Sequence, residues 1–484
     1  MPQERYYLIA IGGTAMAPLA GLLAERGEQV TGSDFPLYPP MSDRIAALGI
    51  EVRPAFAAGN LPADLDEVVV GNLASGDNPE LQEALRRGLR VRSMPRTLHD
   101  EFLAGRHPVV VAGTHGKTTT SALAAWVLAS AGRQPGYLIG GEPLNFEAPY
   151  TVGQGPAFVV EGDEYSTSWD DKGPKFLHYA PRTLLLTSVE FDHADLYADL
   201  EDVKAAFRKV VALVPPDGRI VANGDDPNVL DVLDGARARI YLYRVFETPP
   251  GKDDEGAEPD LAALILSSDA TGSEMVVSEC GRPILTVRLP MGGRHNVGNA
   301  LAAIGAARAF DLSGAEIAAG LASFRGVKRR LEERGTVAGV TVLDDFAHHP
   351  TAVAATVRAT RQLYPGRRLW GVFEPRSMTA GRAEFASRYL EALLPCDGVA
   401  MARPFHAARL ARSGGPGALD VEALAARLTA EGREAFAAAD PAALAEELAP
   451  RLREGDVVLV MSSGSFGGLH GKLLEALTQV SETA

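Results

Sequence analysis

Residues Val109-Val110-Val111-Ala112-Gly113-Thr114-His115-Gly116-Lys117-Thr118-Thr119-Thr120 decide how the central part of this chain folds. An apolar strand runs into a loop with two glycines, and a helix rich in Ala and Leu follows the Lys-Thr pair. Loop amides and a helix N-terminus arranged in this order direct hydrogen-bond donors at phosphate oxygens. The strict phosphate-loop pattern has glycine where this chain has Val111. An ordinary helix start with a capping threonine is therefore the alternative interpretation. The strand before the loop and the helix after it favour a phosphate site.

The loop therefore predicts an ATP site. Lys117 is expected to reach the outer phosphates, and the hydroxyl of Thr118 is expected to bind Mg²⁺. The candidate nucleotide-binding residues of this segment are Gly113, Thr114, His115, Gly116, Lys117, Thr118 and Thr119.

Two later strands also end in polar, mostly acidic residues. One runs from Phe158 into Glu161-Gly162-Asp163-Glu164, and the other runs from Leu184 into Glu190-Phe191-Asp192-His193. Ligands bind outside the carboxyl ends of strands in open α/β sheets, so both clusters are expected beside the phosphate loop. Mg²⁺ takes few protein oxygens and keeps several waters. We expect Glu161 to be a direct metal ligand and His193 to hold a second ion or its water; capping of the next helix is the alternative, and the roles of Asp163 and Glu164 stay open.

The order of predicted elements indicates three α/β domains. A length of 484 residues suits about three domains, and short apolar strands alternate with helical stretches, as in parallel sheets covered by helices. Breaks near Leu103–Pro108 and Gly326–Arg330 place the domains at residues 1–104, 105–330 and 331–484, the outer two Rossmann-like. The N-terminal domain is expected to begin with a strand at Tyr6–Ile11 and a helix at Ala15–Glu25.

The middle and C-terminal parts allow more specific expectations. The Pro-, Gly- and acid-rich stretch Phe246–Asp260 predicts a solvated loop. Short strands, paired antiparallel, are expected at Ala263–Leu266, Glu274–Val277 and Ile284–Leu289, and a helix at Asn296–Ala309. The strands expected in the last domain are Val340–Asp344, Arg368–Phe373, Gly398–Ala402 and Val457–Met461.

Composition excludes several classes of protein. The net charge of −15 argues against a nucleic-acid-binding protein, although it does not exclude local phosphate binding. The two cysteines, Cys280 and Cys396, lie too far apart in sequence for a disulfide framework or a thiolate zinc site, which suits a reducing cytosol. No apolar run reaches about 18 residues, so we expect no membrane span. We expect a cytoplasmic protein that is a monomer or a weak homodimer.

The segment Gly113–Thr118, together with Glu161 and the pair Asp192-His193, resembles the Mur ligases, bacterial enzymes that assemble the peptide of cell-wall precursors. The resemblance covers essentially all three domains. It implies an ATP-dependent, ADP-forming ligase that activates a carboxylate as an acyl phosphate and joins it to an amine. It also implies that Lys117 and His193 act in catalysis.

The same resemblance implies further nucleotide contacts. His295 and Asn296, in Gly293-Arg294-His295-Asn296, match a segment that contacts adenine, although an Asn at a helix start is also a good cap. Arg330 matches a basic linker that meets the nucleotide, with a solvated linker as the alternative, and Asp345 matches an acid near the ATP ribose. The chain has Phe207 where many Mur ligases have a carbamylated lysine, and Ser188 where relatives often have Asn.

The N-terminal domain carries a second candidate site. Gly13-Thr14-Ala15-Met16 is a glycine turn that opens a helix, which suits a diphosphate, and Ser33-Asp34 follow the next strand, where a ribose or uracil group would lie. Ala10, Ala15 and Ala17 weaken the dinucleotide fingerprint, so NAD is disfavoured. Because an ATP site already exists elsewhere, we expect a UDP-sugar here.

Four segments suggest the branch of the family: Tyr38–Ser42, Lys175–Tyr179, Phe373–Ser377 and Met461–His470. They resemble the branch that attaches the tripeptide L-alanyl-γ-D-glutamyl-meso-diaminopimelate to UDP-N-acetylmuramate during peptidoglycan recycling. The branch that adds L-alanine to the same sugar in cell-wall biosynthesis is the alternative. We expect Arg376 to hold a peptide carboxylate, and His348 or His349 to accept a proton from the amine, with His348 also contacting substrate; a plain helix-start role is the alternative for either histidine.

Other classes of function remain as alternatives. A P-loop ATPase that couples hydrolysis to conformational work would hydrolyse ATP without the sugar and would lack a UDP domain. An inactive nucleotide-binding module is disfavoured by the intact Lys117, Glu161 and His193. Folate polyglutamylation is disfavoured because it would not need the N-terminal domain.

Overall fold

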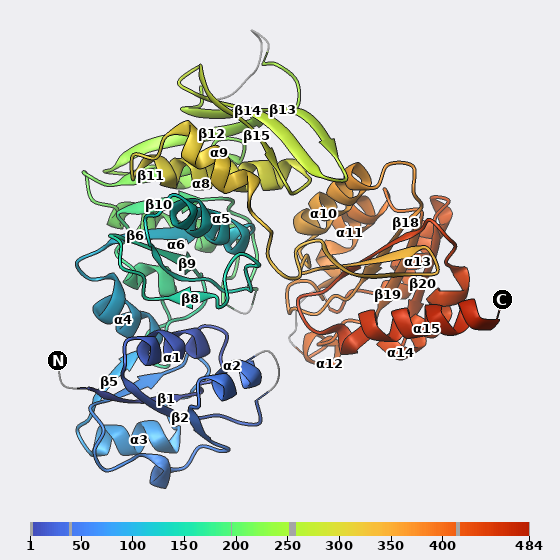
Figure 1. Cartoon of the computed structure of the whole chain (residues 1–484). Helices are drawn as coiled ribbons and strands as arrows, with labels where there is room; N and C mark the ends of the chain where they lie inside the picture. The colour runs from blue at the N-terminus through green and yellow to red at the C-terminus, as the bar shows by residue number, and fades with distance from the viewer. Residues whose placement is uncertain (1–2, 38–40, 195, 251–257, 413–416, 484) are drawn as a thin grey trace.

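The computed structural model describes residues 3–37, 41–194, 196–250, 258–412 and 417–483. Three α/β domains, each built on its own sheet, follow one another along the chain, and the N-terminal and C-terminal domains flank the central one (Figure 1). The expected boundary at 104/105 falls between η2 (His99–Leu103) and β6 (His107–Ala112). The boundary at 330/331 falls between α9 (Gly314–Ala322) and β16 (Glu332–Val337). In the part of the chain described, no helix is long and apolar enough to span a membrane.

The N-terminal domain is Rossmann-like, as expected. Its five parallel strands have the order β3-β2-β1-β4-β5, the arrangement of a mononucleotide-binding half with its first strand in the centre. The first strand begins one residue earlier than expected and ends two residues earlier, at Ile9, because Ala10 has a φ of +61°. The elements are β1 (Arg5–Ile9), α1 (Met16–Glu25), β2 (Gln29–Ser33), α2 (Met41–Ala47), β3 (Glu51–Arg53), β4 (Glu67–Val70), α3 (Pro79–Arg86), β5 (Arg90–Ser93) and α4 (Met94–Leu98).

The central domain contains a ten-stranded sheet with the order β15-β14-β13-β12-β11-β10-β6-β9-β7-β8. Its parallel part holds β6, β9 (Ala157–Gly162), β10 (Thr183–Leu186), β11 (Arg219–Asn223), β12 (Arg239–Phe246) and β7 (Gly136–Leu138), and β8 (Tyr150–Thr151) is an antiparallel edge. The expected antiparallel strands are confirmed and are longer than predicted: β13 (Leu261–Asp269), β14 (Gly272–Glu279) and β15 (Arg282–Leu289).

Helices cover both faces of this sheet, which explains why its central strands are apolar throughout. Val109 and Val111 of β6 pack in one core with α5 (Lys117–Ser130), α8 (Arg294–Arg308) and α9. Val110 and Ala112 pack in the other core with α6 (Leu200–Leu213) and α7 (Pro227–Val232). Burial on both sides fixes the strand, and therefore fixes the phosphate loop that follows it.

The C-terminal domain is also Rossmann-like, with the strand order β16-β17-β21-β18-β19-β20. β17 (Val340–Asp345), β21 (Val457–Met461), β18 (Leu369–Phe373), β19 (Gly398–Ala402) and β20 (Glu434–Ala438) are parallel, and β16 pairs antiparallel at the edge. The helices are α10 (Pro350–Leu363), α11 (Ala386–Leu393), α12 (Ala407–Leu410), α13 (Val421–Ala430), α14 (Pro441–Leu448) and α15 (Leu469–Thr483). β16 was not predicted, because its side chains are largely exposed and polar.

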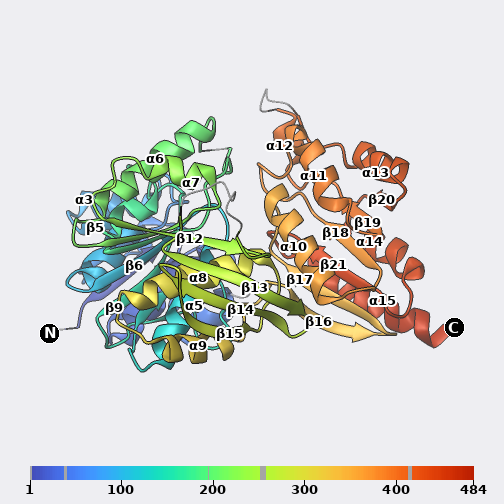
Figure 2. The same cartoon turned by 90° about the horizontal axis from the view of Figure 1, so that it is seen from above.

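Figure 2 shows the central and C-terminal domains side by side, with α10 and β17 on the side of the C-terminal domain that faces the central one. Two expectations fall partly outside the described residues. These are Tyr38–Pro40 of the Tyr38–Ser42 segment and residues 251–257 of the predicted loop. The predicted loop Phe246–Asp260 begins one residue later than expected, because Phe246 is the last residue of β12.

His107 gives a pH prediction for the central domain. It begins β6 with Nε2 2.8 Å from Thr183 Oγ1, and burial, with nearby Arg182 and Arg219, lowers its pKa from 6.5 to about 4. The unfolded chain therefore binds a proton between these values that the folded chain does not, so stability falls as pH drops from about 6.5 towards 4. We expect His107→Gln to lose less thermal stability than the wild type between pH 7.5 and pH 5, measured by thermal unfolding. At pH 7.5 the difference between the two proteins reports lost packing alone, and an equal pH loss in both would contradict the prediction.

Candidate active site

A cavity of about 1910 Å³ is lined by residues of all three domains. It gathers many of the residues that the sequence singled out, although they come from distant parts of the chain. From the N-terminal and central domains the lining includes Thr14, Ala15, Thr114, His115, Gly116, Lys117, Thr118, Thr119, Glu161, His193, His295 and Asn296. From the linker and the C-terminal domain it includes Arg330, Asp345 and His348.

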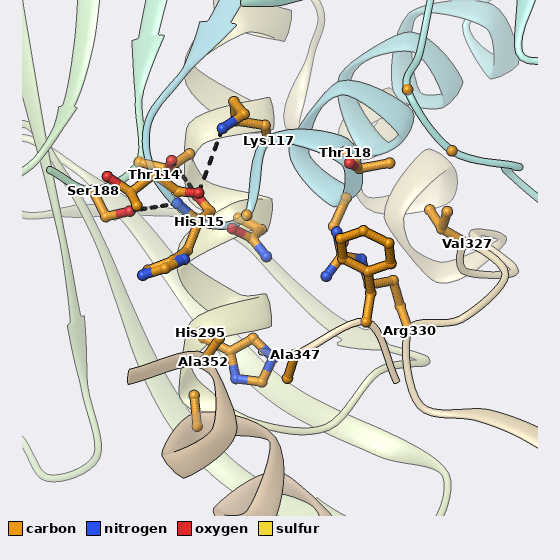
Figure 3. A pocket seen from close by; sticks show the side chains of 18 of the residues that line it. Thr114, His115, Lys117, Thr118, Ser188, His295, Val327, Arg330, Ala347 and Ala352 are labelled. Atoms are coloured by element: carbon orange, nitrogen blue, oxygen red, sulfur yellow. Dashed lines mark hydrogen bonds between the residues drawn. The ribbon is translucent and has the colours of Figure 1, made fainter. Parts of the chain in front are cut away.

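The phosphate loop is held by the end of the neighbouring strand β10. The amide N–H of Thr114 donates to the carbonyl of Ser188 at 2.9 Å, and the N–H of His115 donates to Ser188 Oγ at 2.9 Å (Figure 3). Ser188 thus has a structural role at the position where relatives often have Asn. The first N–H groups of α5, which begins at Lys117, have no carbonyl partner within the helix, and the residues of its first turn, Lys117 to Thr119, line the cavity.

Gly113 is required by the loop on two grounds. Its φ is +143°, and a Cβ there would collide with the hydroxyl of Thr187. We expect Gly113→Ala to raise the KM for ATP by at least about tenfold, because a displaced loop costs well over 1 kcal/mol of phosphate binding. Steady-state kinetics with varied ATP measure this. Gly59→Ala is the matched control, since Gly59 has nothing within 4 Å of its added Cβ and should keep the wild-type KM.

Lys117 is folded back onto its own loop. Its Nζ donates to the carbonyl of Gly113 at 2.6 Å and to Glu164 Oε2 at 2.7 Å. Burial disfavours the charged ammonium, but the nearby carboxylates of Glu164, Asp163 and Glu161 together outweigh it and raise the pKa of Lys117. The lysine is therefore a buried cation whose present partner is a carboxylate, and the phosphate oxygens of a nucleotide offer the same kind of partner.

Glu164 connects Lys117 to His193. Its Oε1 lies 2.9 Å from His193 Nε2, and although burial opposes ionisation, Lys117 and His193 lower the pKa of this carboxyl. His193 itself sits in the left-handed region with φ +55°, a conformation that the surrounding contacts must maintain. The sequence left the role of Glu164 open, and no local pattern indicated that it pairs with both residues.

Glu161 and Thr118 form the oxygen-rich part of the site. Thr118 Oγ1 donates to Glu161 Oε1 at 2.9 Å, and the N–H of Gly140 donates to Glu161 Oε2 at 2.8 Å. Burial raises the pKa of Glu161, so its negative charge is incompletely compensated by the protein. A hydroxyl and a partly buried carboxylate of this kind are the ligands that Mg²⁺ prefers, and the cation would supply the missing compensation.

Arg330 and Asp345 lie where the central domain passes into the C-terminal one. Asp345 accepts the N–H groups of Ala347 and Leu331, both at 2.8 Å, which fixes the linker against the end of β17. The guanidinium of Arg330 lies over the ring of Phe346 at 5.2 Å. Arg330 therefore stacks on Phe346 at the cavity wall and is not a freely solvated linker residue, while its contact with the nucleotide stays a prediction.

The side chains of His295 and Asn296 differ in their exposure to the cavity. His295 is exposed on the cavity wall, as Figure 3 shows. Asn296 is only 4% exposed, and its side-chain amide donates to the carbonyl of Gly292 at 2.8 Å. The residue that caps α8 is Gly293, so the alternative that Asn296 caps this helix is wrong.

The two adjacent histidines of the C-terminal domain point to different places. His348 lines the cavity, with Nε2 3.8 Å from Asp192 Oδ2, and burial lowers its pKa to about 4. His349 is 1% exposed, is absent from the cavity wall, and faces His115 and Glu190. Of the two, His348 is the one that can meet a substrate.

Several expected substrate residues lie away from the cavity wall. Gly13, Met16, Ser33, Asp34 and Arg376 do not line it. The hydroxyl of Ser33 is buried and donates to Glu80, and Asp34 Oδ2 accepts the N–H of Gly12 at 2.7 Å. The guanidinium of Arg376 lies 4.1 Å from the ring of Phe405 and 3.4 Å from Glu374.

The structure also adds residues that the sequence did not point to. Glu142 lies on the cavity wall and pairs with Arg44 of the N-terminal domain at 3.0 Å and with Lys328 of the linker at 2.6 Å. It therefore links the N-terminal domain to the central domain and to the segment that leads into the C-terminal domain. Phe207, at the position of the carbamylated lysine of other Mur ligases, is fully buried with its ring 5.4 Å from Phe176.

Comparisons with known proteins cover nearly the whole chain. Residues 5–105 match "Mur ligase family, catalytic domain", residues 111–307 match "Mur ligase middle domain", and residues 329–464 match "Mur ligase, glutamate ligase domain". A UDP-N-acetylmuramate--L-alanyl-gamma-D-glutamyl-meso-2,6-diaminoheptandioate ligase of Escherichia coli is 37% identical over 99% of this chain and 100% of that protein.

Two further relatives carry the names of the two candidate activities, L-alanine addition and murein peptide ligation. A UDP-N-acetylmuramate--L-alanine ligase of Kineococcus radiotolerans is 36% identical over 98% of this chain and 96% of that protein. The crystal structure of a murein peptide ligase from Psychrobacter arcticus superposes with a TM-score of 0.70 at 32% identity, over 98% of this chain and 99% of that one.

Proposed function

The chain belongs to the Mur ligase family, and we propose that it joins the lactyl carboxylate of UDP-N-acetylmuramate to the amine of L-alanyl-γ-D-glutamyl-meso-diaminopimelate in peptidoglycan recycling. It is an ATP-dependent, ADP-forming ligase. The observation that carries the proposal is one cavity lined by Lys117, Thr118 and Glu161 of the central domain, Thr14 of the first domain and His348 of the last.

The first chemical step is phosphoryl transfer. A carboxylate oxygen attacks the γ-phosphorus, and the bond from that phosphorus to the bridging oxygen of ADP breaks, which leaves an acyl phosphate and ADP. Such transfer is catalysed mainly by positioning and by neutralisation of charge. Lys117 exchanges Glu164 for phosphate oxygens, and the N-terminus of α5 supplies backbone donors. Thr118 and Glu161 would hold Mg²⁺, which supplies charge neutralisation when bound.

The second step forms the amide. The amine nitrogen attacks the carbonyl carbon of the acyl phosphate, and the tetrahedral intermediate then expels phosphate as the carbon–oxygen bond breaks. The attacking amine must lose a proton. His348 lines the cavity and is neutral at pH 7 because burial lowers its pKa to about 4, so its imidazole has a free lone pair with which to accept that proton as the intermediate forms.

The outer domains deliver the two substrates to this centre. Thr14 and Ala15, at the N-terminus of α1, border the cavity where a diphosphate of the UDP-sugar would be held by helix N–H groups. Arg358 of α10 is exposed on the C-terminal wall, where it would meet the carboxylates of the peptide. Because ATP and UDP-sugars are intracellular metabolites, we place the reaction in the cytoplasm.

Phosphate release with paired substrates tests the proposal. The purified chain receives ATP, Mg²⁺ and UDP-N-acetylmuramate, with either the tripeptide or L-alanine. We expect release that depends on the sugar and is fastest with the tripeptide. Faster release with L-alanine would establish the alanine-adding ligase, which the Kineococcus radiotolerans relative keeps as the second candidate. Release that needs neither sugar nor amine would indicate an uncoupled ATPase.

A further inference from the structure

Three potential metal ligands meet where the C-terminal domain contacts the phosphate loop. They are His115 of the loop, Glu190 after β10, and His349 immediately before α10. His115 Nε2 lies 2.9 Å and His349 Nδ1 lies 3.1 Å from the same atom, Glu190 Oε2. One donor atom from each residue falls within 4.8 Å of the others.

His349 is the unusual member of this group. It is 1% exposed, and in the described part of the chain neither of its ring nitrogens makes a hydrogen bond, since the approach of Nδ1 to Glu190 lacks the required geometry. Burial lowers the pKa of His349, so the imidazole is neutral and offers a lone pair. Buried polar groups almost always have partners, and a histidine without one calls for an explanation.

We propose that His115, Glu190 and His349 form a binding site for a divalent transition metal ion of the zinc type. Two imidazoles and one carboxylate are a common zinc ligand set, whereas Mg²⁺ prefers oxygen ligands alone. Tetrahedral zinc with bonds of about 2.0–2.1 Å keeps neighbouring donor atoms roughly 3.3 Å apart. The two contacts to Glu190 therefore need to open by only a few tenths of an ångström.

The surroundings of Glu190 support this assignment. Thr351 Oγ1 donates to Glu190 Oε1 at 2.9 Å, and Arg388 lies 3.6 Å from the same oxygen, so Oε1 is oriented by the protein while Oε2 faces the two histidines. Ligating carboxylates and histidines are usually oriented by such outer contacts. The site differs from the expected Mg²⁺ site, which uses Thr118 and Glu161.

The position of the site gives the metal a definite consequence. His115 and Glu190 belong to the central domain and His349 belongs to the C-terminal domain, so all three ligands meet only when the two domains are docked as they are here. A bound ion would hold α10 against the phosphate loop. The ion is thus expected to stabilise the docked arrangement, independently of which amine the enzyme uses.

Cobalt and zinc titrations of the full chain test the site. With excess Mg²⁺ present and no nucleotide, Co²⁺ should give visible absorption bands at one equivalent, and Zn²⁺ should displace it and raise the midpoint of thermal unfolding. His349→Gln and Glu190→Gln should each weaken Zn²⁺ binding by at least about tenfold. His178→Gln, which removes a histidine that pairs with Asp171 and does not line the cavity, is the matched control and should bind Zn²⁺ like the wild type.

Each result of these titrations either supports the metal site or contradicts it. Zinc binding that survives His349→Gln and Glu190→Gln, or that is lost in His178→Gln, would overturn the proposal, as would the absence of a Co²⁺ band in the wild type. Circular dichroism and ADP binding confirm that each variant folds. If His349→Gln fails to fold, Glu190→Gln decides the question, because Glu190 is part of the cavity wall and its substitution keeps the size of the side chain.

Discussion

Lys117→Met is expected to lower the rate of ADP formation by about a thousandfold or more, which corresponds to roughly 4 kcal/mol of lost transition-state stabilisation. The reason is that phosphoryl transfer depends on charge neutralisation, and the ammonium of Lys117 is a buried cation at the start of α5. A methionine has similar length and volume but no charge, so the substitution removes the cation while keeping the packing. Coupled measurement of ADP with UDP-N-acetylmuramate and tripeptide gives the rate.

The buried carboxylate of Glu164 complicates this variant, because Lys117→Met leaves it with His193 as its charged partner. Some loss of thermal stability is therefore expected along with the loss of activity. Lys172→Met is the matched control, since within the described residues the one hydrogen bond of the Lys172 ammonium is to the carbonyl of Ser168 at 3.3 Å, and this lysine does not line the cavity. A Lys117→Met enzyme that retained a tenth or more of the wild-type rate would remove the phosphate-binding role of this lysine.

Glu161→Gln is expected to reduce turnover by at least about a hundredfold and to raise the Mg²⁺ concentration needed for half-maximal rate. Glutamine can still accept the N–H of Gly140 and meet the hydroxyl of Thr118, so the change removes a negative charge and little else. Because burial raises the pKa of Glu161, the neutral substitute should not destabilise the fold. Turnover measured across a Mg²⁺ titration, with thermal unfolding in parallel, tests both parts.

The control for this variant is a buried acid that pairs with protein groups alone. Glu80 is fully buried in the N-terminal domain, where it accepts hydrogen bonds from Tyr7 and Asn60. Glu80→Gln should change stability without altering the Mg²⁺ dependence of the rate. An unchanged Mg²⁺ requirement in Glu161→Gln would show that this carboxylate does not hold the metal.

Much of the fold follows from local sequence patterns. The apolar run Val109–Ala112 indicated a strand buried on both faces, and both cores that cover it are present. The glycines at 113 and 116 indicated a loop between strand and helix, and the structure shows that both have positive φ. Alternating strands and helices indicated three α/β domains, while the exposed and polar β16 carried no hydrophobic period and was not predicted.

The site is only partly predictable in this way. The sequence predicted that Glu161, Lys117 and Thr118 lie close together, because they stand at a strand end and a helix start and parallel strands end at one edge of a sheet. Single sequence positions did not indicate that Glu164 bridges Lys117 and His193, or that Glu142 ties three parts of the chain together. Those contacts join residues that are distant in sequence and leave no periodic signal.

The sequence by itself determined which elements form and which backbone positions can cradle a phosphate, because strand burial, glycine conformations and helix starts are local properties. The tertiary structure alone decided the directions of the side chains. It turned His348 into the cavity and His349 towards His115, and it buried the amide of Asn296 against Gly292. The physical reason is that side-chain direction at a domain junction depends on how the domains pack, and neighbours in space are then far apart along the chain.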